Sequence, residues 1–222
     1  TDSTITLSND NVQITFVKGS VFDISKLVLS GKELITKKGL NTLPWTLTYK
    51  GPQGENPVLF PSHGVYKGFS KEVKNGEASI TFKWIMKLTY NDDAAVLMTI
   101  SLPDDSDLAY WNVQAGTPKG WVVSNTQFPR ITVDRPKDGK LITSAGWGAE
   151  YKLAPQVYTT TYPSVTGSMQ LLLAHNADGA IYYATQDTKG CLKDLRAACG
   201  TNSLTMLTDV VTSEGWSNHD TK

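Results

Sequence analysis

The sequence predicts an all-β protein that is built from large antiparallel sheets and has little helix. The first observation is the segment 79–90, in which every even-numbered residue is large and apolar. Successive side chains of a strand point to opposite faces, so this segment is a long strand with one apolar and one polar face. Similar alternating segments, separated by turn residues, recur along most of the chain, and helical periodicity is scarce. Together these observations favour a sandwich or barrel.

The first half of the chain alternates strands with well-defined turns. Strands are expected at residues 11–17, 21–29, 33–36, 45–50, 65–74, 79–90 and 94–102. The apolar residues of the long strand are Ile80, Phe82, Trp84, Met86, Leu88 and Tyr90. Turns are expected at 30–32 and 91–93, and the two Gly and two Pro of 51–57 exclude regular structure there. Asn75-Gly76 predicts a tight hairpin turn, because both residues tolerate positive φ.

The second half repeats the pattern with shorter segments. Strands are expected at 110–116, 121–127, 131–133, 140–143, 167–175, 180–186 and 203–211, which makes about fourteen in all. Residues 176–179 form the turn of a second hairpin. The candidate helix is Cys191–Cys199, where Leu192 and Leu195 stand three apart, although the same residues also fit a strand. Nothing resembles an interdomain linker, so residues 1–222 are expected to form a single β-sandwich domain.

Bulk composition limits the classes of function. The 222 residues carry 21 basic and 21 acidic side chains, so the basic excess of a nucleic-acid-binding protein is missing. No apolar run is long enough to span a membrane. The chain opens on Thr1-Asp2-Ser3 without a leader and stops abruptly after strand-like sequence. We interpret it as a processed chain, its signal peptide removed, and as the N-terminal part of a larger protein.

Cysteine and acidic residues leave two questions open. Cys191 and Cys199 are the only cysteines, and they can form one disulfide or remain two buried thiols. Three carboxylates within 104–107 suit a calcium loop, but the segment lacks the Gly and distal Glu of a helix–loop–helix site, and a solvated turn is the alternative. No zinc signature is present, and neither a cofactor nor a metal is expected.

Catalytic motifs are missing, and aromatic residues are the better indication of function. The sequence has no nucleophile elbow, phosphate loop or dinucleotide fingerprint, so no catalytic residue is predicted. Its aromatic residues include six Trp and nine Tyr, several of them in expected loops, where flat rings can stack on the C–H faces of sugars. The residues predicted to bind carbohydrate are Trp147, Glu150, Tyr162, Trp121 and His63. The alternative is that the rings close the ends of the sandwich or face a neighbouring domain.

The order of several motifs resembles a known family. Phe128-Pro129-Arg130-Ile131 follows a strand, Tyr162-Pro163-Ser164 leads to the apolar run 169–174, and 178–187 completes a hairpin. This series, together with the opening strand 11–17 and the turn 30–34, resembles the N-terminal domain of uncharacterised bacterial glycoside hydrolases. That domain is a galactose-mutarotase-like supersandwich, a large antiparallel sandwich of two sheets. The resemblance covers most of the chain and is strongest over 128–187.

The resemblance implies a non-catalytic accessory domain of a secreted or periplasmic enzyme. Such a domain packs in front of a C-terminal catalytic (β/α)₈ barrel, supports it and contacts carbohydrate through its loops. A free-standing sugar mutarotase or epimerase is the alternative, and true mutarotases of this fold use a His and a Glu as acid and base. His175 and Glu150 are not matched to those two positions. A third hypothesis is a purely structural or adhesive β-module, since a shared fold does not transfer a reaction.

Overall fold

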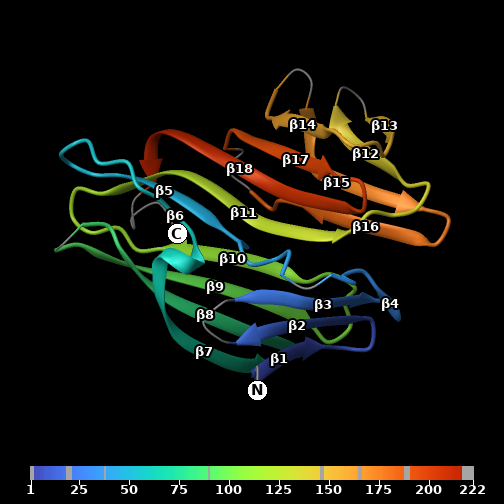
Figure 1. Ribbon diagram of the computed structural model, residues 1–222, viewed down its shortest axis with the longest axis horizontal. Coiled ribbons are helices and arrows are strands. Elements are labelled where there is room, and N and C mark those ends of the chain that lie inside the picture. Colours follow the sequence, from blue (N-terminus) through green and yellow to red (C-terminus); the bar gives the residue numbers. More distant parts are fainter. Residues whose placement is uncertain are drawn as a thin grey trace. The chain divides into compact units, whose positions relative to one another are not determined.

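The chain folds into strands with a single helical turn in the part that the structure describes. The computed structural model describes residues 3–18, 22–37, 39–89, 91–145, 148–164, 167–187 and 191–216. Within these ranges the helical element is the 3-10 turn η1 (Pro61–His63), and every other element is a strand (Figure 1). The predicted all-β class with little helix is therefore confirmed. By its internal contacts the chain divides into unit 1, Thr1–Asn125 with Ser213–Lys222, and unit 2, Thr126–Thr212.

Unit 1 is built from antiparallel hairpins. Its strands are β1 (Ser3–Ser8), β2 (Val12–Lys18), β3 (Asp23–Leu29), β4 (Lys32–Glu33), β5 (Thr46–Lys50), β6 (Val58–Leu59), β7 (Gly64–Lys74), β8 (Glu77–Lys87), β9 (Asp93–Pro103) and β10 (Tyr110–Ala115). They form two four-stranded sheets, β1-β2-β3-β4 and β10-β9-β8-β7, and the hairpin β5-β6. The strand β11 (Val122–Asp134) begins beside β5, where the Ser124 hydroxyl donates to the Thr48 carbonyl over 3.2 Å.

Aromatic side chains join the two sheets of unit 1. Phe16 of β2 packs edge-on against Phe82 of β8, with ring centroids 5.1 Å apart. Trp84 lies two residues further along β8 and contacts the ring of Trp45 at 5.6 Å. The predicted apolar face of this strand, Ile80, Phe82, Trp84, Met86 and Leu88, is buried, and Tyr90 lies outside the described residues. The alternation in the sequence thus identified the core face of unit 1.

The hairpin turn at Asn75-Gly76 is confirmed. Both residues have positive φ, 54° and 76°, as a two-residue turn between right-twisted strands requires. The pairing of Lys74 with Glu77 closes the turn directly. It sets the register of β7 on β8, so the buried side chains of β8 fall on one face.

Unit 2 contains two further antiparallel sheets. Its strands are the rest of β11, β12 (Lys140–Ala145), β13 (Ala149–Lys152), β14 (Val157–Tyr162), β15 (Gly167–Asn176), β16 (Gly179–Ala184), β17 (Lys193–Cys199) and most of β18 (Ser203–Trp216). Within this unit the strand orders are β14-β17-β18-β11 and β13-β12-β15-β16. The Tyr183 hydroxyl of β16 lies 2.9 Å from both the Pro129 carbonyl and the Thr208 hydroxyl, so the sheets pack face to face. Burial raises the pKa of this phenol.

The candidate helix at Cys191–Cys199 is wrong, and the alternative strand is correct. Residues 193–199 form β17, in which every second side chain is buried. Tertiary pairing on both sides, with β14 and β18, overrides the weak helical spacing of the two leucines. Both cysteines are free thiols. The extended strand from Lys193 to Cys199 spans about 20 Å, whereas a disulfide joins Cα atoms about 4.4–6.8 Å apart.

Other differences concern element boundaries and the number of sheets. The expected strands 121–127 and 131–133 are one continuous strand, β11, and the short strands β6, β13 and β14 were not expected. The described strands are grouped into four sheets, which does not confirm the two-sheet supersandwich. Alternation identifies a strand and its buried face, but it does not specify the partner strand.

Candidate functional site

Three connections between strands meet at one end of unit 2. Their described residues are 145 and 148–149, 162–164 and 167, and 185–187 and 191–193, and together we call these residues the loop end. The pairing of Ala145 with Gly167 places the first two side by side. The pairing of Tyr162 with Lys193 brings in the third, and the Thr185 amide donates to the Gln170 carbonyl over 3.0 Å. The loop end therefore collects residues that are far apart in the sequence.

A buried lysine lies at the centre of the loop end. Lys193 shares the inward-facing side of β17 with Leu195 and Ala197, and its side chain is 2% exposed. Its ammonium lies 2.6 Å from Asp187 Oδ2 and 2.9 Å from Gln170 Oε1. The ring of Tyr162 lies beside it, with the centroid 5.0 Å from Nζ. A buried cation needs such partners, because leaving water without them is costly.

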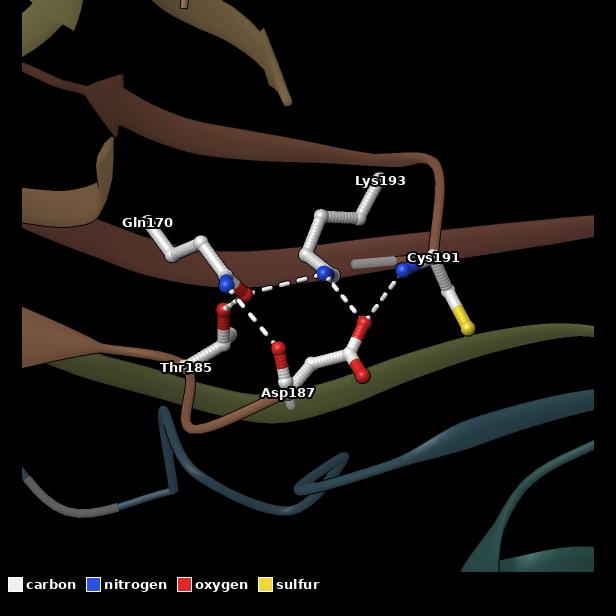
Figure 2. A network of polar contacts seen from close by, with 5 residues as sticks. All are labelled: Gln170, Thr185, Asp187, Cys191 and Lys193. Carbon is white, nitrogen blue, oxygen red and sulfur yellow. Dashed lines mark hydrogen bonds and ion pairs between the residues drawn. The ribbon is translucent and has the colours of Figure 1, made fainter. Parts of the chain in front are cut away.

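The acceptors of Lys193 are themselves fixed by further hydrogen bonds (Figure 2). The Thr185 hydroxyl donates to Gln170 Oε1 over 2.6 Å, and the Gln170 amide donates to the Asp187 carbonyl over 3.1 Å. The backbone amide of Cys191 donates to Asp187 Oδ2 over 2.6 Å. Gln170 belongs to one sheet of unit 2 and Lys193 to the other, so the network links the two sheets and anchors the 185–193 connection at both ends.

This geometry gives Lys193 a structural role at the loop end. Its ammonium is directed at two oxygens and a ring, and Asp187 Oδ2 is shared between that ammonium and a backbone amide. A lysine nucleophile instead needs a free, neutral amine. The network can hold Tyr162 and the adjoining connections in one arrangement, which is what a pre-formed binding rim needs.

One of the predicted carbohydrate-binding residues, Tyr162, belongs to the loop end. Tyr162 is half-buried at the end of β14, beside Lys193. The predicted residue Trp147 lies outside the described residues. Of the residues near it in the sequence, Gly148 donates its backbone amide to the Ala145 carbonyl over 3.0 Å. The pairing of Ala145 with Gly167 places these two residues beside the start of β15. The structure therefore brings Ala145, Gly148 and Tyr162 to the same end of unit 2.

Glu150 lies on the outward-facing side of β13, in an exposed cluster of charges. Lys140 Nζ donates to Glu150 Oε2 over 2.6 Å, and His175 Nε2 lies 3.1 Å from Glu150 Oε1. The hydrogen bond from Lys140, helped by His175, lowers the pKa of the Glu150 carboxyl. The sequence analysis placed none of these partners near Glu150, because their proximity depends on the pairing of β13, β12 and β15.

The titration of Glu150 provides a test of this cluster. Its lowered pKa means that the cluster stabilises the fold above the pKa of the unfolded chain, and that this contribution is lost as the pH falls through the folded pKa. We expect Lys140→Ala to raise the Glu150 pKa towards its ordinary value, as followed by carboxyl chemical shifts in NMR. Lys152→Ala is the control, and an unchanged Glu150 titration in Lys140→Ala would contradict the ion pair.

The other two predicted residues belong to unit 1. Trp121 is buried, 2% exposed, and its indole Nε1 donates to Asp92 Oδ2 over 3.0 Å. A ring in this position serves the core, so the expectation of an open loop ring at Trp121 is not supported. His63 is exposed at the end of η1, with its ring 3.5 Å from that of Phe60. Neither residue belongs to the unit that contains Tyr162.

Sequence reasoning missed Gln170, Asp187 and Lys193. A usable signal was present, because in a strand over 193–199 the lysine alternates in phase with Leu195 and Ala197. An inward-facing lysine requires a buried acceptor nearby. The helix interpretation of 191–199 did not place Lys193 on an inward face, so this requirement was overlooked. Within the described residues, no group of three or more His, Cys, Asp or Glu side chains could hold a metal ion. No helix among those residues is long and apolar enough to cross a membrane.

Comparisons with known proteins gave a match in sequence and a match in fold. No family model matches it. A Bacteroides thetaiotaomicron protein described as "Putative glycoside hydrolase" is 36% identical over 214 residues, which cover 96% of this chain and 32% of the relative. The chain therefore spans about a third of the length of the curated relative it matches.

A solved structure shows a similar fold. The alpha-N-acetylgalactosaminidase NagBb from Bifidobacterium bifidum, solved as a quadruple mutant, superposes with a TM-score of 0.64 at 12% identity. The match covers 93% of this chain and 33% of the enzyme. At this identity the likeness concerns the fold alone. The chain is thus related in sequence to one larger protein and in fold to part of another.

Proposed function

We propose that this chain is a non-catalytic accessory domain of a larger glycoside hydrolase. The observation that carries the proposal is the sequence match, which spans 96% of this chain but 32% of the relative named as a glycoside hydrolase. The fold match to a glycosidase has the same proportions, 93% and 33%. In this proposal a separate catalytic domain, a (β/α)₈ barrel, supplies the reaction, and the present chain, a domain of galactose-mutarotase-like type, supports it.

The arrangement of charges at the loop end supports an accessory role. Glycosidases place two carboxyl groups about 5–9.5 Å apart, on either side of the bond they cleave. Asp187, the carboxylate in the loop-end network, already accepts hydrogen bonds from Lys193 and Cys191. A carboxylate held in this way anchors a connection and is poorly placed to transfer a proton.

We further propose that the loop end contacts carbohydrate. Tyr162 lies there together with Ala145 and Gly148, which stand on either side of Gly146-Trp147 in the sequence, and the Lys193 network holds the Tyr162 strand end in place. Because the lysine and the aspartate neutralise each other, a neutral sugar suits this end better than an acidic one. The name of NagBb makes an α-linked N-acetylgalactosamine glycoside the first probe to use.

Calorimetric titration of the 222-residue chain tests sugar contact. The panel contains N-acetylgalactosamine, galactose and glucose as methyl α-glycosides. Removing a stacking ring should weaken binding about tenfold or more, so we expect this loss for Trp147→Ala and Tyr162→Ala. Tyr162→Phe keeps the ring and should retain binding. Tyr110→Ala removes a tyrosine that is 38% exposed in unit 1 and serves as the control. Flat titrations across the panel would leave the scaffold role alone.

One observation favours a mutarotase as the second candidate function. His175 and Glu150 lie 3.1 Å apart on the same side of one sheet, and an acid and a base of these types are what a sugar mutarotase needs. However, their direct contact leaves no space for a sugar ring between them, and Lys140 also binds the carboxylate. Polarimetry on fresh α-galactose or α-glucose distinguishes the two functions, because an accessory domain leaves the rate at its buffer value.

A further inference from the structure

From Leu171 to Ala174, strand β15 is apolar on both of its faces. Its inward side chains, Leu172 and Ala174, are completely buried between the sheets of unit 2. Its outward side chains, Met169, Leu171 and Leu173, are also apolar, and Met169 is 43% exposed. A strand of an antiparallel sheet with one solvated face normally carries polar residues on that face, whereas strands that are apolar on both faces are covered on both.

The apolar surface continues across the neighbouring strands. Leu173 is paired with Ile142 of β12 and with Tyr182 of β16, and directly paired residues share a face of the sheet. Leu171 is paired in the same way with Ala184. Tyr182 is 52% exposed, and Ile142, Leu171 and Leu173 are partly exposed. We call this surface of Ile142, Met169, Leu171, Leu173, Tyr182 and Ala184 the outer face of β13-β12-β15-β16.

Charged residues border the outer face at one end. Lys140 is paired with Lys152 and with His175, so these side chains form the next row on the same side. Glu150 ends the row of Ile142, Leu173 and Tyr182, and it binds Lys140 and His175. The border therefore combines two lysines and a histidine with one carboxylate, and its charge is complementary to an acidic edge.

We propose that the outer face is where another domain of the same polypeptide docks, through an apolar surface with an acidic edge. This inference rests on the proposed function, because it identifies where the rest of the glycoside hydrolase is held. The relative contains about two thirds of its length beyond the matched segment, which is enough for a large folded domain. An apolar face of this kind on a soluble protein marks an interaction site.

Charge insertion on the outer face of the full-length enzyme tests the proposal. The variant Met169→Lys/Tyr182→Lys places two cations where the docked domain would cover them. Its control is Val73→Lys/Tyr110→Lys, which changes one aliphatic residue and one tyrosine, 77% and 38% exposed, in unit 1. In the isolated chain, both double variants should shift Tm by no more than about 2 °C, because each altered residue is at least 38% exposed.

In the full-length enzyme the two variants should behave differently. We expect limited proteolysis between this domain and the rest to be about tenfold faster in Met169→Lys/Tyr182→Lys, since burying unpaired charges opposes docking. Small-angle scattering should show a larger radius of gyration, and the control should match the unaltered enzyme. An active enzyme in which both variants match the unaltered one would overturn the inference and leave the accessory role standing.

Two further outcomes are also decisive. If the isolated chain forms a dimer in size-exclusion chromatography that Met169→Lys/Tyr182→Lys dissociates, the outer face binds a second copy and the inference is wrong. If the gene encodes no further domain, or the full-length protein has no glycosidase activity, the proposed function fails first, and the docking site fails with it.

Discussion

Lys193→Ala is expected to lower the free energy of unfolding by about 3 kcal/mol, which corresponds to a fall in Tm of roughly 6–12 °C for a chain of this size. The substitution removes a cation that is 2% exposed and leaves its partners behind. Asp187 Oδ2 and Gln170 Oε1 would each lose an ammonium within 2.9 Å. We place the effect at the lower end of the range for broken buried pairs, because the Asp187 side chain is 23% exposed.

Differential scanning calorimetry measures the effect, with Lys140→Ala as the matched control. Lys140 also forms an ion pair at 2.6 Å, but its side chain is 52% exposed, so its removal should change stability by about 1 kcal/mol or less. Equal, small effects of the two substitutions would contradict a buried network at the loop end. The comparison tests whether the loss of stability depends on burial rather than on ion pairing alone, because the two pairs differ most in the exposure of the lysine.

Trp84→Ala is expected to destabilise unit 1 by about 4 kcal/mol, the largest effect of any substitution discussed here. The Trp84 residue is 2% exposed, and its ring meets those of Trp45 at 5.6 Å and Phe22 at 5.8 Å. Removing the indole leaves a cavity between the two sheets that the surrounding side chains cannot fill. Chemical denaturation followed by fluorescence and by circular dichroism gives the loss of stability.

The neighbouring residue on the same strand is the control for Trp84→Ala. Lys83 is exposed and points to the opposite side of β8, so Lys83→Ala should change stability by about 0.5 kcal/mol or less. If both substitutions had the same effect, the alternation that places Phe82, Trp84 and Met86 in the core would be wrong.

The sequence predicted unit 1 more completely than unit 2, and the strands show why. In β8 the polar and apolar residues alternate almost perfectly, so strand, length and buried face could all be identified. In β15 both faces are apolar, and alternation alone does not show which face is the core. In β17 charged residues interrupt the alternation of apolar side chains, namely Lys193, Asp194 and Arg196. The spacing of Leu192 and Leu195 therefore fitted a helix as well as a strand.

The tertiary structure also decided which of the predicted site residues come together and which do not. Trp121 looked like a loop ring, but the Asp92 carboxylate gives its indole N–H a partner inside the fold, and the ring is buried. Ala145 and Tyr162 come to the same end of unit 2 because β15 pairs with β12 and β14 pairs with β17. The Lys193 network needs two sheets and three connections, and no local pattern encodes that arrangement.

The amino-acid sequence by itself determined the all-β class, most strands, the Asn75-Gly76 hairpin and the buried face of β8. These properties follow from side-chain periodicity and turn preferences, which act within a few residues. Only the tertiary structure decided which strands share a sheet, that Lys193 is buried against Asp187, and that β15 presents an apolar outer face. Such contacts join residues far apart in the chain, so they depend on how whole sheets pack.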